Sequence, residues 1–305
     1  MAPSEPPDPA LIEVDPPEPV DIPADPAARW QSLHRIGVKL PLRDYLRELW
    51  RRREFVLTIP MGERRAQNQD TVLGNIWHLL NPLFLIGVYY LVFGVFMEMA
   101  GRQRGDGIDN FLGFLVVGVI TFDYTRNAVN SGARMIVKNR ALVRSINFPR
   151  AVLPLSGLVS ESLGHLYAIP LMWFLLALTG EYPQWAWFLI VPIVMLQAMF
   201  NLGVGMIVAR LTFHMRDVQQ VLPYALRIWF YMSGVLFPVT MIDQPVIRTI
   251  LELNPMFAFV DLSRSAFMDG EFAPYPWAVA ATWSVLALVI GFFYFRSAES
   301  EYGRV

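Results

Sequence analysis

The sequence predicts an all-α integral membrane protein with six transmembrane helices. Hydrophobic residues make up 54% of the chain and charged residues only 17%, whereas soluble domains carry about 25% charged residues. Six apolar stretches are each long enough for the roughly 20 residues that a helix needs to cross a bilayer. These stretches are 76–97, 111–131, 152–178, 186–210, 219–241 and 276–296.

The charges of the loops predict the orientation of these helices. Basic residues gather before the first stretch, in the loop 132–151, after the fourth stretch and in the final tail. The loop 242–275 instead carries five acidic residues against two arginines. Because positively charged loops stay on the cytoplasmic side, we expect both termini in the cytoplasm and the protein in the plasma (inner) membrane.

Four regions differ in composition along the chain. Residues 1–41 begin with a proline- and acid-rich segment, which predicts a disordered cytoplasmic tail, with docking to a partner as the alternative. Residues 42–56 predict an amphipathic helix in the membrane interface, with a soluble helix packed on a core as the alternative. The six-span domain occupies 71–296, and 297–305 is a second cytoplasmic tail. The residues expected at the interface are Arg43, Arg47, Trp50 and Arg51.

A helix start lies in the long loop between the fifth and sixth stretches. Asn254 is a favourable N-cap residue, and Pro255 suits the first helical position. The segment that follows is mostly apolar. We therefore expect short helices on the outer face that re-enter the membrane.

Composition excludes several classes of function. The chain has no cysteine, so disulfides and thiol chemistry are excluded. Its two lysines, Lys39 and Lys138, each follow a valine, so the Gly-Lys pair of a phosphate-binding loop is absent. A net charge of −1 gives no field that attracts nucleic acid. We expect no metal site, no cofactor and no enzymatic activity in this chain.

Ionisable residues inside the apolar stretches are candidates for function. Asp123, Glu161 and Arg227 share a depth of roughly 12–14 Å from the inner ends of their stretches at 1.5 Å per residue. His165 follows Glu161 by one turn and is expected to be a packed, hydrogen-bonded histidine. One interpretation pairs Arg227 with Glu161 or with Asp123. The other is a polar lining that hydrates a path or binds a pyrophosphate group through Arg227.

Four segments carry a resemblance to a known family. Residues 71–83 contain Leu-Gly, Trp and Pro at the entry to the first stretch, and 137–150 form a basic loop ending in Phe-Pro. Residues 213–239 hold an Arg-Asp turn, and 253–269 hold the Asn-Pro helix with an arginine. In this order they resemble the permease subunit of type-2 ABC exporters, in particular the polysaccharide-exporting (Wzm-like) branch. Actinobacterial galactan exporters are similar in general character.

The resemblance implies a homodimer with two copies of a cytoplasmic ABC ATPase subunit (Wzt-like), which would bind ATP and Mg. The substrate would be a lipid-linked glycan of the galactan, O-antigen, teichoic-acid or capsule type. The basic loop and the Arg-Asp turn would contact the ATPase, although these charges could serve topology alone. The implied coupling residues are Arg134, Lys138, Arg140, Arg144, Arg216 and Asp217.

A glycan substrate would need aromatic rings along its path, since rings offer large contact area with little loss of entropy. Aromatic residues recur at helical spacing in the first stretch, and two tyrosines flank an arginine in the fifth. An aromatic belt at the lipid headgroups is the alternative. The path residues are Tyr89, Phe93, Phe96, Tyr224, Arg227, Tyr231 and Phe237.

Other functions fit parts of the pattern. In a proton-coupled secondary transporter, Glu161 and His165 would form the relay, but the sequence has no inverted repeat. A membrane-embedded enzyme would need catalytic acids in a sizeable loop, and these loops are short. A type-2 ABC permease for a small hydrophobic substrate would share most of the features above.

Overall fold

The computed structural model describes residues 41–58, 60, 77–96, 108, 110–145, 148–270, 272 and 274–302, all within one compact unit, Gly37–Val305. Within these ranges the chain is helical and contains no strand. The predicted tail 1–41 lies outside them except for Pro41, as do residues 303–305 of the second tail.

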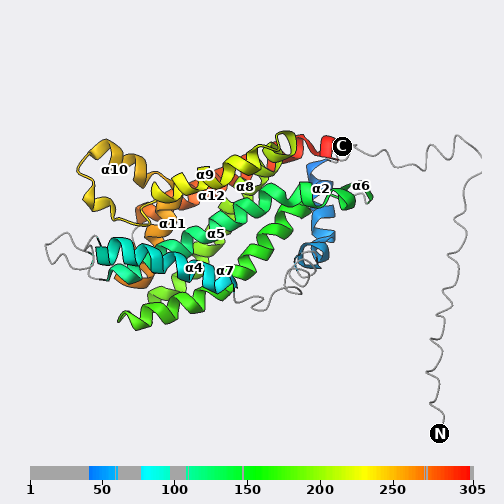
Figure 1. The fold of residues 1–305 in the computed structure, drawn as a ribbon. Coiled ribbons are helices and arrows are strands. Elements are labelled where there is room, and N and C mark those ends of the chain that lie inside the picture. Colours follow the sequence, from blue (N-terminus) through cyan, green and yellow to red (C-terminus); the bar gives the residue numbers. More distant parts are fainter. Residues whose placement is uncertain are drawn as a thin grey trace, which may run out of the picture. The chain divides into compact units, whose positions relative to one another are not determined.

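The described helices follow one another along the chain as Figure 1 shows, some with short 3₁₀ or π-helical segments attached. They are α2 (Leu42–Arg51), α4 (Trp77–Tyr89) with η2 (Tyr90–Phe96), α5 (Phe111–Lys138), α6 (Arg140–Ser145), α7 (Val152–Leu178), η3 (Trp185–Leu189) with α8 (Ile190–His214), α9 (Val218–Tyr231), η4 (Val239–Met241), α10 (Pro245–Glu252), α11 (Pro255–Arg264) with η5 (Ser265–Asp269), α12 (Pro274–Ser297) and α13 (Glu299–Tyr302).

Three helical segments in the described part of the chain are long and apolar enough to cross a membrane. They are Val152–Leu178, Trp185–His214 and Pro274–Ser297, and Leu80–Phe96 is a shorter apolar helix. The third predicted stretch, 152–178, coincides with α7. The other apolar stretches correspond to helices whose ends differ from the prediction.

α5 is the helix against which most others pack. It contacts α7, α8, α11, α4 and α9, and Figure 1 shows it running through the middle of the bundle. Its 28 residues span about 42 Å at 1.5 Å per residue, which exceeds the roughly 30 Å of a bilayer's hydrocarbon core. α5 is therefore longer than a membrane crossing needs.

The fifth apolar stretch is not one helix, in contrast to the predicted span 219–241. α9 ends at Tyr231, and the chain then turns at Gly234, which has a left-handed φ of 62°. Pro238 follows in an extended conformation and is succeeded by a single 3₁₀ turn. The apolar residues after Tyr231 thus line a buried turn, because Ser233, Val235 and Leu236 are all buried.

α11 is a buried helix that packs among α5, α8 and α12. It begins as predicted: the side chain of Asn254 accepts a hydrogen bond from the Met256 amide at 3.1 Å, and Pro255 occupies the first turn. Asn254 also donates to the Met232 carbonyl at 2.9 Å. One side chain therefore starts α11 and holds it to the end of α9.

The two ends of the bundle differ in the elements that they carry. Figure 1 shows α2, α6 and the red C-terminal end of the helical bundle together at one end, and α10 at the other. In α2 only Tyr45 is buried, whereas Leu46 and Trp50 are 46% and 71% exposed. α2 stops at a turn at Arg52, which divides the predicted helix 42–56. Its exposed apolar side chains match those of an interfacial helix.

Candidate functional site

α9 presents an uncovered aromatic face with an arginine at its centre. Tyr224 is 67% exposed and Tyr231 is 44% exposed, and Arg227 between them is also exposed. The opposite side of the helix is buried through Leu226 and Phe230. A single copy of the chain therefore leaves the predicted path residues of α9 free to face lipid, substrate or a second copy.

α4 contributes a second aromatic group next to this face. The Tyr89 ring stacks on Phe230 of α9 at 5.4 Å and lies 6.3 Å from the ring of Phe93. Phe96 is 72% exposed. The predicted i, i+4, i+7 stripe assumed an α-helix, but residues 90–96 are π-helical, and a wider turn changes the angular position of each side chain.

Two cations lie near the Tyr89 hydroxyl. Arg126 of α5 and Arg227 of α9 both act on it electrostatically, and the hydroxyl also interacts with Tyr231. Aromatic rings contribute broad apolar contact area, and guanidinium groups bind phosphate through parallel hydrogen bonds. This corner of α4, α5 and α9 thus combines aromatic rings with two guanidinium groups, of which that of Arg126 is paired with Asp123. The seventh predicted path residue, Phe237, is half-buried and packs on the main core instead.

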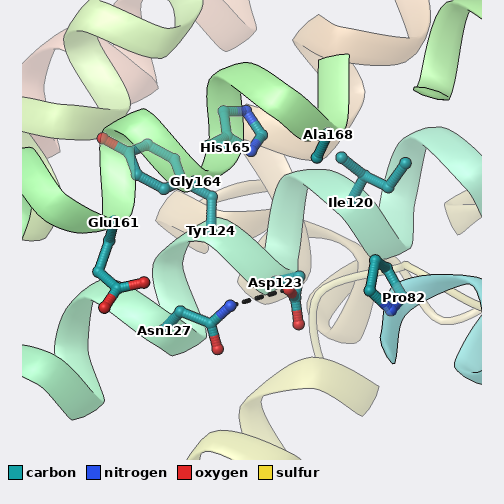
Figure 2. Close-up of a pocket in the computed structure, with 9 residues that line it drawn as sticks. All are labelled: Pro82, Ile120, Asp123, Tyr124, Asn127, Glu161, Gly164, His165 and Ala168. Atoms are coloured by element: carbon teal, nitrogen blue, oxygen red, sulfur yellow. Dashed lines mark hydrogen bonds between the residues drawn. The ribbon is translucent and has the colours of Figure 1, made fainter. Parts of the chain in front are cut away.

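A small polar pocket of about 30 Å³ lies between α4, α5 and α7. Figure 2 shows Glu161 and His165 on α7, with Asp123 and Asn127 on the neighbouring α5. The pocket therefore brings together three of the four predicted intramembrane ionisable residues. Its lining is Pro82, Ile120, Asp123, Tyr124, Asn127, Glu161, Gly164, His165 and Ala168.

The fourth predicted member, Arg227, does not line this pocket. Asp123 instead accepts hydrogen bonds from the guanidinium of Arg126 and, at 2.9 Å, from the amide of Asn127. Arg126 is therefore one partner of Asp123, and the pairing of Arg227 with Glu161 or Asp123 stays a prediction. The sequence did contain a signal for the pair of Asp123 and Arg126, because residues at i and i+3 lie on the same face of a helix.

His165 is a packed histidine, as the sequence predicted. It is 6% exposed, and its ring stacks on the ring of Tyr124 at 4.5 Å. The Tyr124 and Ser162 hydroxyls are hydrogen-bonded at 2.7 Å. Within the described ranges, no group of three or more His, Asp or Glu side chains is placed to hold a metal ion.

A buried polar chain links α5 to α8, and it was not predicted. Gln197 donates to the Thr125 hydroxyl at 2.9 Å, and Thr125 donates to the side-chain oxygen of Asn201 at 2.7 Å. All three residues are buried. Hydrogen bonds between polar side chains hold membrane helices together, so this chain fixes α5 on α8.

The sequence analysis also did not identify Arg264 as a site residue. Its guanidinium donates to the carbonyl oxygens of Gly234 at 2.8 Å and Val235 at 2.9 Å, and to that of Phe114 at 3.2 Å. It also lies 3.2 Å from the centre of the Phe114 ring. The turn after α9 is therefore held to α5 and α11 by one buried cation.

The predicted coupling residues lie on the ends of helices. Arg134 and Lys138 are exposed near the end of α5, and Arg140 begins α6. Arg216 and Asp217 are exposed at the turn before α9. Arg144 belongs to α6, but its side chain lies outside the described part of the structure. α6 is tied to the body through Val143, which is buried in an apolar cluster with residues of α2, α7, α8 and α12.

These features define a class of protein. Long apolar helices, a polar pocket among them and a basic helical segment at one end are typical of a membrane permease. A comparison with protein families gives the same class, since residues 56–268 match the ABC-2 type transporter family. The chain belongs to the ABC-2 type transporter family, and it is an integral membrane protein.

Curated relatives resemble the chain over most of its length. It is 30% identical to the O-antigen export system permease protein RfbA of Myxococcus xanthus, over 84% of this chain and 97% of that protein. A protein with the same description from Klebsiella pneumoniae is 22% identical over 83% and 95%. The polysialic acid transport protein KpsM of Escherichia coli is 27% identical over 74% and 86%. The family resemblance inferred from the four sequence segments is thus confirmed.

Proposed function

We propose that this chain is the permease subunit of an ABC exporter that moves a lipid-linked polysaccharide to the outer face of the inner membrane. The observation that carries the proposal is the exposed face of α9, where Tyr224 and Tyr231 flank Arg227. The tyrosines would stack on sugar rings, and Arg227 would bind the phosphate that joins glycan to lipid. Relatives named for export of O-antigen and polysialic acid support this class of substrate.

The same proposal gives a topology. α4, α5, α7, α8, α9 and α12 are the six spans, and α9 is completed by the re-entrant turn and by α11. The tails 1–41 and 297–305 are cytoplasmic, α2 lies in the inner membrane interface, and α10 is outside. The placement of α10 and of α2 with α6 at opposite ends of the bundle supports this assignment.

A homodimer would enclose the substrate path. The face of α9 that carries Tyr224 and Arg227 is uncovered in one copy, and a second copy would place an equivalent face opposite to it. Galactan is the first glycan to test, and O-antigen and teichoic acid are the alternatives. The path would thus be lined by both copies.

Energy would come from two copies of an ABC ATPase, which would bind ATP and Mg and dock on the exposed cations at the end of α5 and on α6. The test uses Arg140→Glu with Arg144→Glu, which reverses charge on the docking helix, and Arg248→Glu on α10 as the matched control. We expect the double variant to insert and dimerise but to lose co-purification with its ATPase subunit. The control keeps it. Undiminished association and export by the double variant would contradict the docking role.

A further inference from the structure

Tyr45 is the main residue through which α2 is held to the rest of the protein. It is the only buried residue of α2 and is 2% exposed. Its ring packs edge-on against Phe292 of α12 at 6.0 Å, and Arg296 lies 5.3 Å from its centre. Leu49 of α2 is partly buried and packs on the same apolar cluster, so Tyr45 is the main but not the sole anchor of α2.

Glu299 meets Tyr45 from the other side, at the start of α13. The charge of the Glu299 carboxylate acts on the Tyr45 hydroxyl. The Glu299 carboxylate accepts a hydrogen bond from the backbone amide of Arg150 at 2.9 Å. The amide of Ala151 donates to the Tyr45 hydroxyl at 3.3 Å. The two side chains thus accept hydrogen bonds from two successive backbone amides at the end of the loop 132–151.

These amides belong to the start of α7, where N–H groups lack acceptors within the helix. Ala151 is the N-cap residue and has no side chain that could cap α7 itself. The cap comes from elsewhere in the chain: a hydroxyl from α2 and a carboxylate from α13. A carboxylate at this place also complements the positive end of the helix dipole.

We infer that Tyr45 and Glu299 are positioning residues that make the loop 132–151, α2 and the end of α12 move as one unit when the ATPase acts. Apolar packing alone would hold these elements together without fixing their relative positions. Two directional hydrogen bonds to consecutive amides fix these positions, because each hydrogen bond lengthens when the loop end is displaced. The inference rests on the proposed docking of an ATPase on this loop.

The link also reaches the transmembrane helices. α12 packs along the length of α8, and Arg296 and Phe292 join α12 to Tyr45. A displacement of the loop end would therefore act on α7 directly and on α12 through Glu299. Without the link, α12 would follow the docking loop only through apolar packing.

The functional test compares Tyr45→Phe and Glu299→Ala in the reconstituted permease–ATPase complex, with Tyr302→Phe as matched control. Tyr302 is equally buried, and its hydroxyl donates to the Phe295 carbonyl at 3.0 Å without touching the loop. We expect glycan exported per ATP hydrolysed to fall about fivefold in each test variant, as loss of one buried hydrogen bond shifts a two-state equilibrium. We expect ATPase binding to be unchanged in both test variants. Glu299→Gln should restore part of the ratio of glycan exported to ATP hydrolysed, and Tyr302→Phe should keep the wild-type ratio.

A distance measurement on the permease alone in nanodiscs separates this inference from the proposed function. The chain has no cysteine, so spin labels attach only at Arg47→Cys on α2 and Ala141→Cys on α6, both exposed positions. We expect one narrow distance distribution, broadened by Tyr45→Phe and not by Tyr302→Phe. An unchanged distribution, or an equal effect of both variants, would overturn the link. A narrow distance distribution in the permease, together with no glycan export by the permease–ATPase complex, would instead refute the proposed function.

Discussion

Gly203 of α8 and Gly291 of α12 meet backbone to backbone. A Cβ atom on Gly291 would lie 2.2 Å from the Gly203 carbonyl oxygen, and one on Gly203 would lie 2.2 Å from the backbone of Ala287. Small residues let membrane helices approach this closely, and the packing that results is what drives their association. The two glycines therefore set the distance between α8 and α12.

The first prediction tests this contact. Gly291→Ala should destabilise the protein by about 1–3 kcal/mol, because the methyl group meets rigid backbone and the helices must separate. Thermal unfolding in detergent measures the effect. Gly87→Ala is the control, since nothing lies within 4 Å of a Cβ at that position. Equal melting temperatures for the two variants would show that α8 and α12 separate without cost.

The second prediction concerns the buried guanidinium of Arg264. Arg264→Met should cost several kcal/mol, because the carbonyl oxygens of Phe114, Gly234 and Val235 lose a charged donor and stay buried. The exposed ion pair of Arg248 with Glu252 provides the control, and Arg248→Met should cost less than about 1 kcal/mol. Denaturant unfolding compares them. A mild effect at Arg264 would mean that water replaces its hydrogen bonds.

The sequence predicted the helices whose ends carry a chemical signal. Asn254 and Pro255 marked the start of α11, and the apolar run 152–178 matched α7. It could not predict where α9 ends. Hydropathy stays high through residues 232–237, and an apolar buried turn has the same composition as an apolar helix.

Partners of the buried charges were harder to predict than their depth. Arg264 binds backbone carbonyls, which every residue possesses, so no residue type in the sequence indicates them. Asp123 and Arg227 share a predicted depth, but depth does not fix the direction in which a side chain points on its helix. Tyr45 capping α7 joins residues more than a hundred positions apart, and a single sequence gives no such pairing.

The third prediction concerns topology. A cysteine at Asp243, in the exposed segment before α10, should react with a membrane-impermeant maleimide in intact cells. A cysteine at Met215, which is 59% exposed beside the turn before α9, should react only in inverted vesicles. The cysteine-free background makes each label unique. Labelling of both positions from the same side would refute the proposed crossing by α9 and its turn.

The fourth prediction concerns pH. Burial raises the pKa of the Glu299 carboxyl above 4.5, although the Arg150 amide, the Tyr45 hydroxyl and the charges of Arg150 and Arg296 oppose the shift. The native state thus binds this proton more tightly than the unfolded state does. The contribution of this group to stability is therefore greatest below pH 4.5 and is lost as the pH rises through the native pKa.

Hydrogen exchange of the segment 292–302, corrected for intrinsic rates, measures this effect. Protection should decrease as the pH rises from about 4.5. Glu299→Gln should remove the dependence, whereas Glu252→Gln on α10 should leave it. Protection that increases over this range, or the same profile for Glu299→Gln, would show that another group controls the contact.

The fifth prediction tests whether the face of α9 touches substrate. Tyr224→Leu should lower export several-fold, because the stacking of an aromatic ring is worth about 1 kcal/mol beyond its area. Phe174 of α7, which is 60% exposed, is the control, since Phe174→Leu keeps an apolar side chain towards lipid. Arg227→Gln should lower export about tenfold or more by removing a charge-assisted contact, and Arg227→Lys should recover part of it.

All variants should unfold at the wild-type temperature, because these side chains are exposed. If Tyr224→Leu and Phe174→Leu reduce export equally, the tyrosines belong to an aromatic belt against lipid. If Arg227→Gln lowers stability together with export, Arg227 serves helix packing and the phosphate contact is wrong.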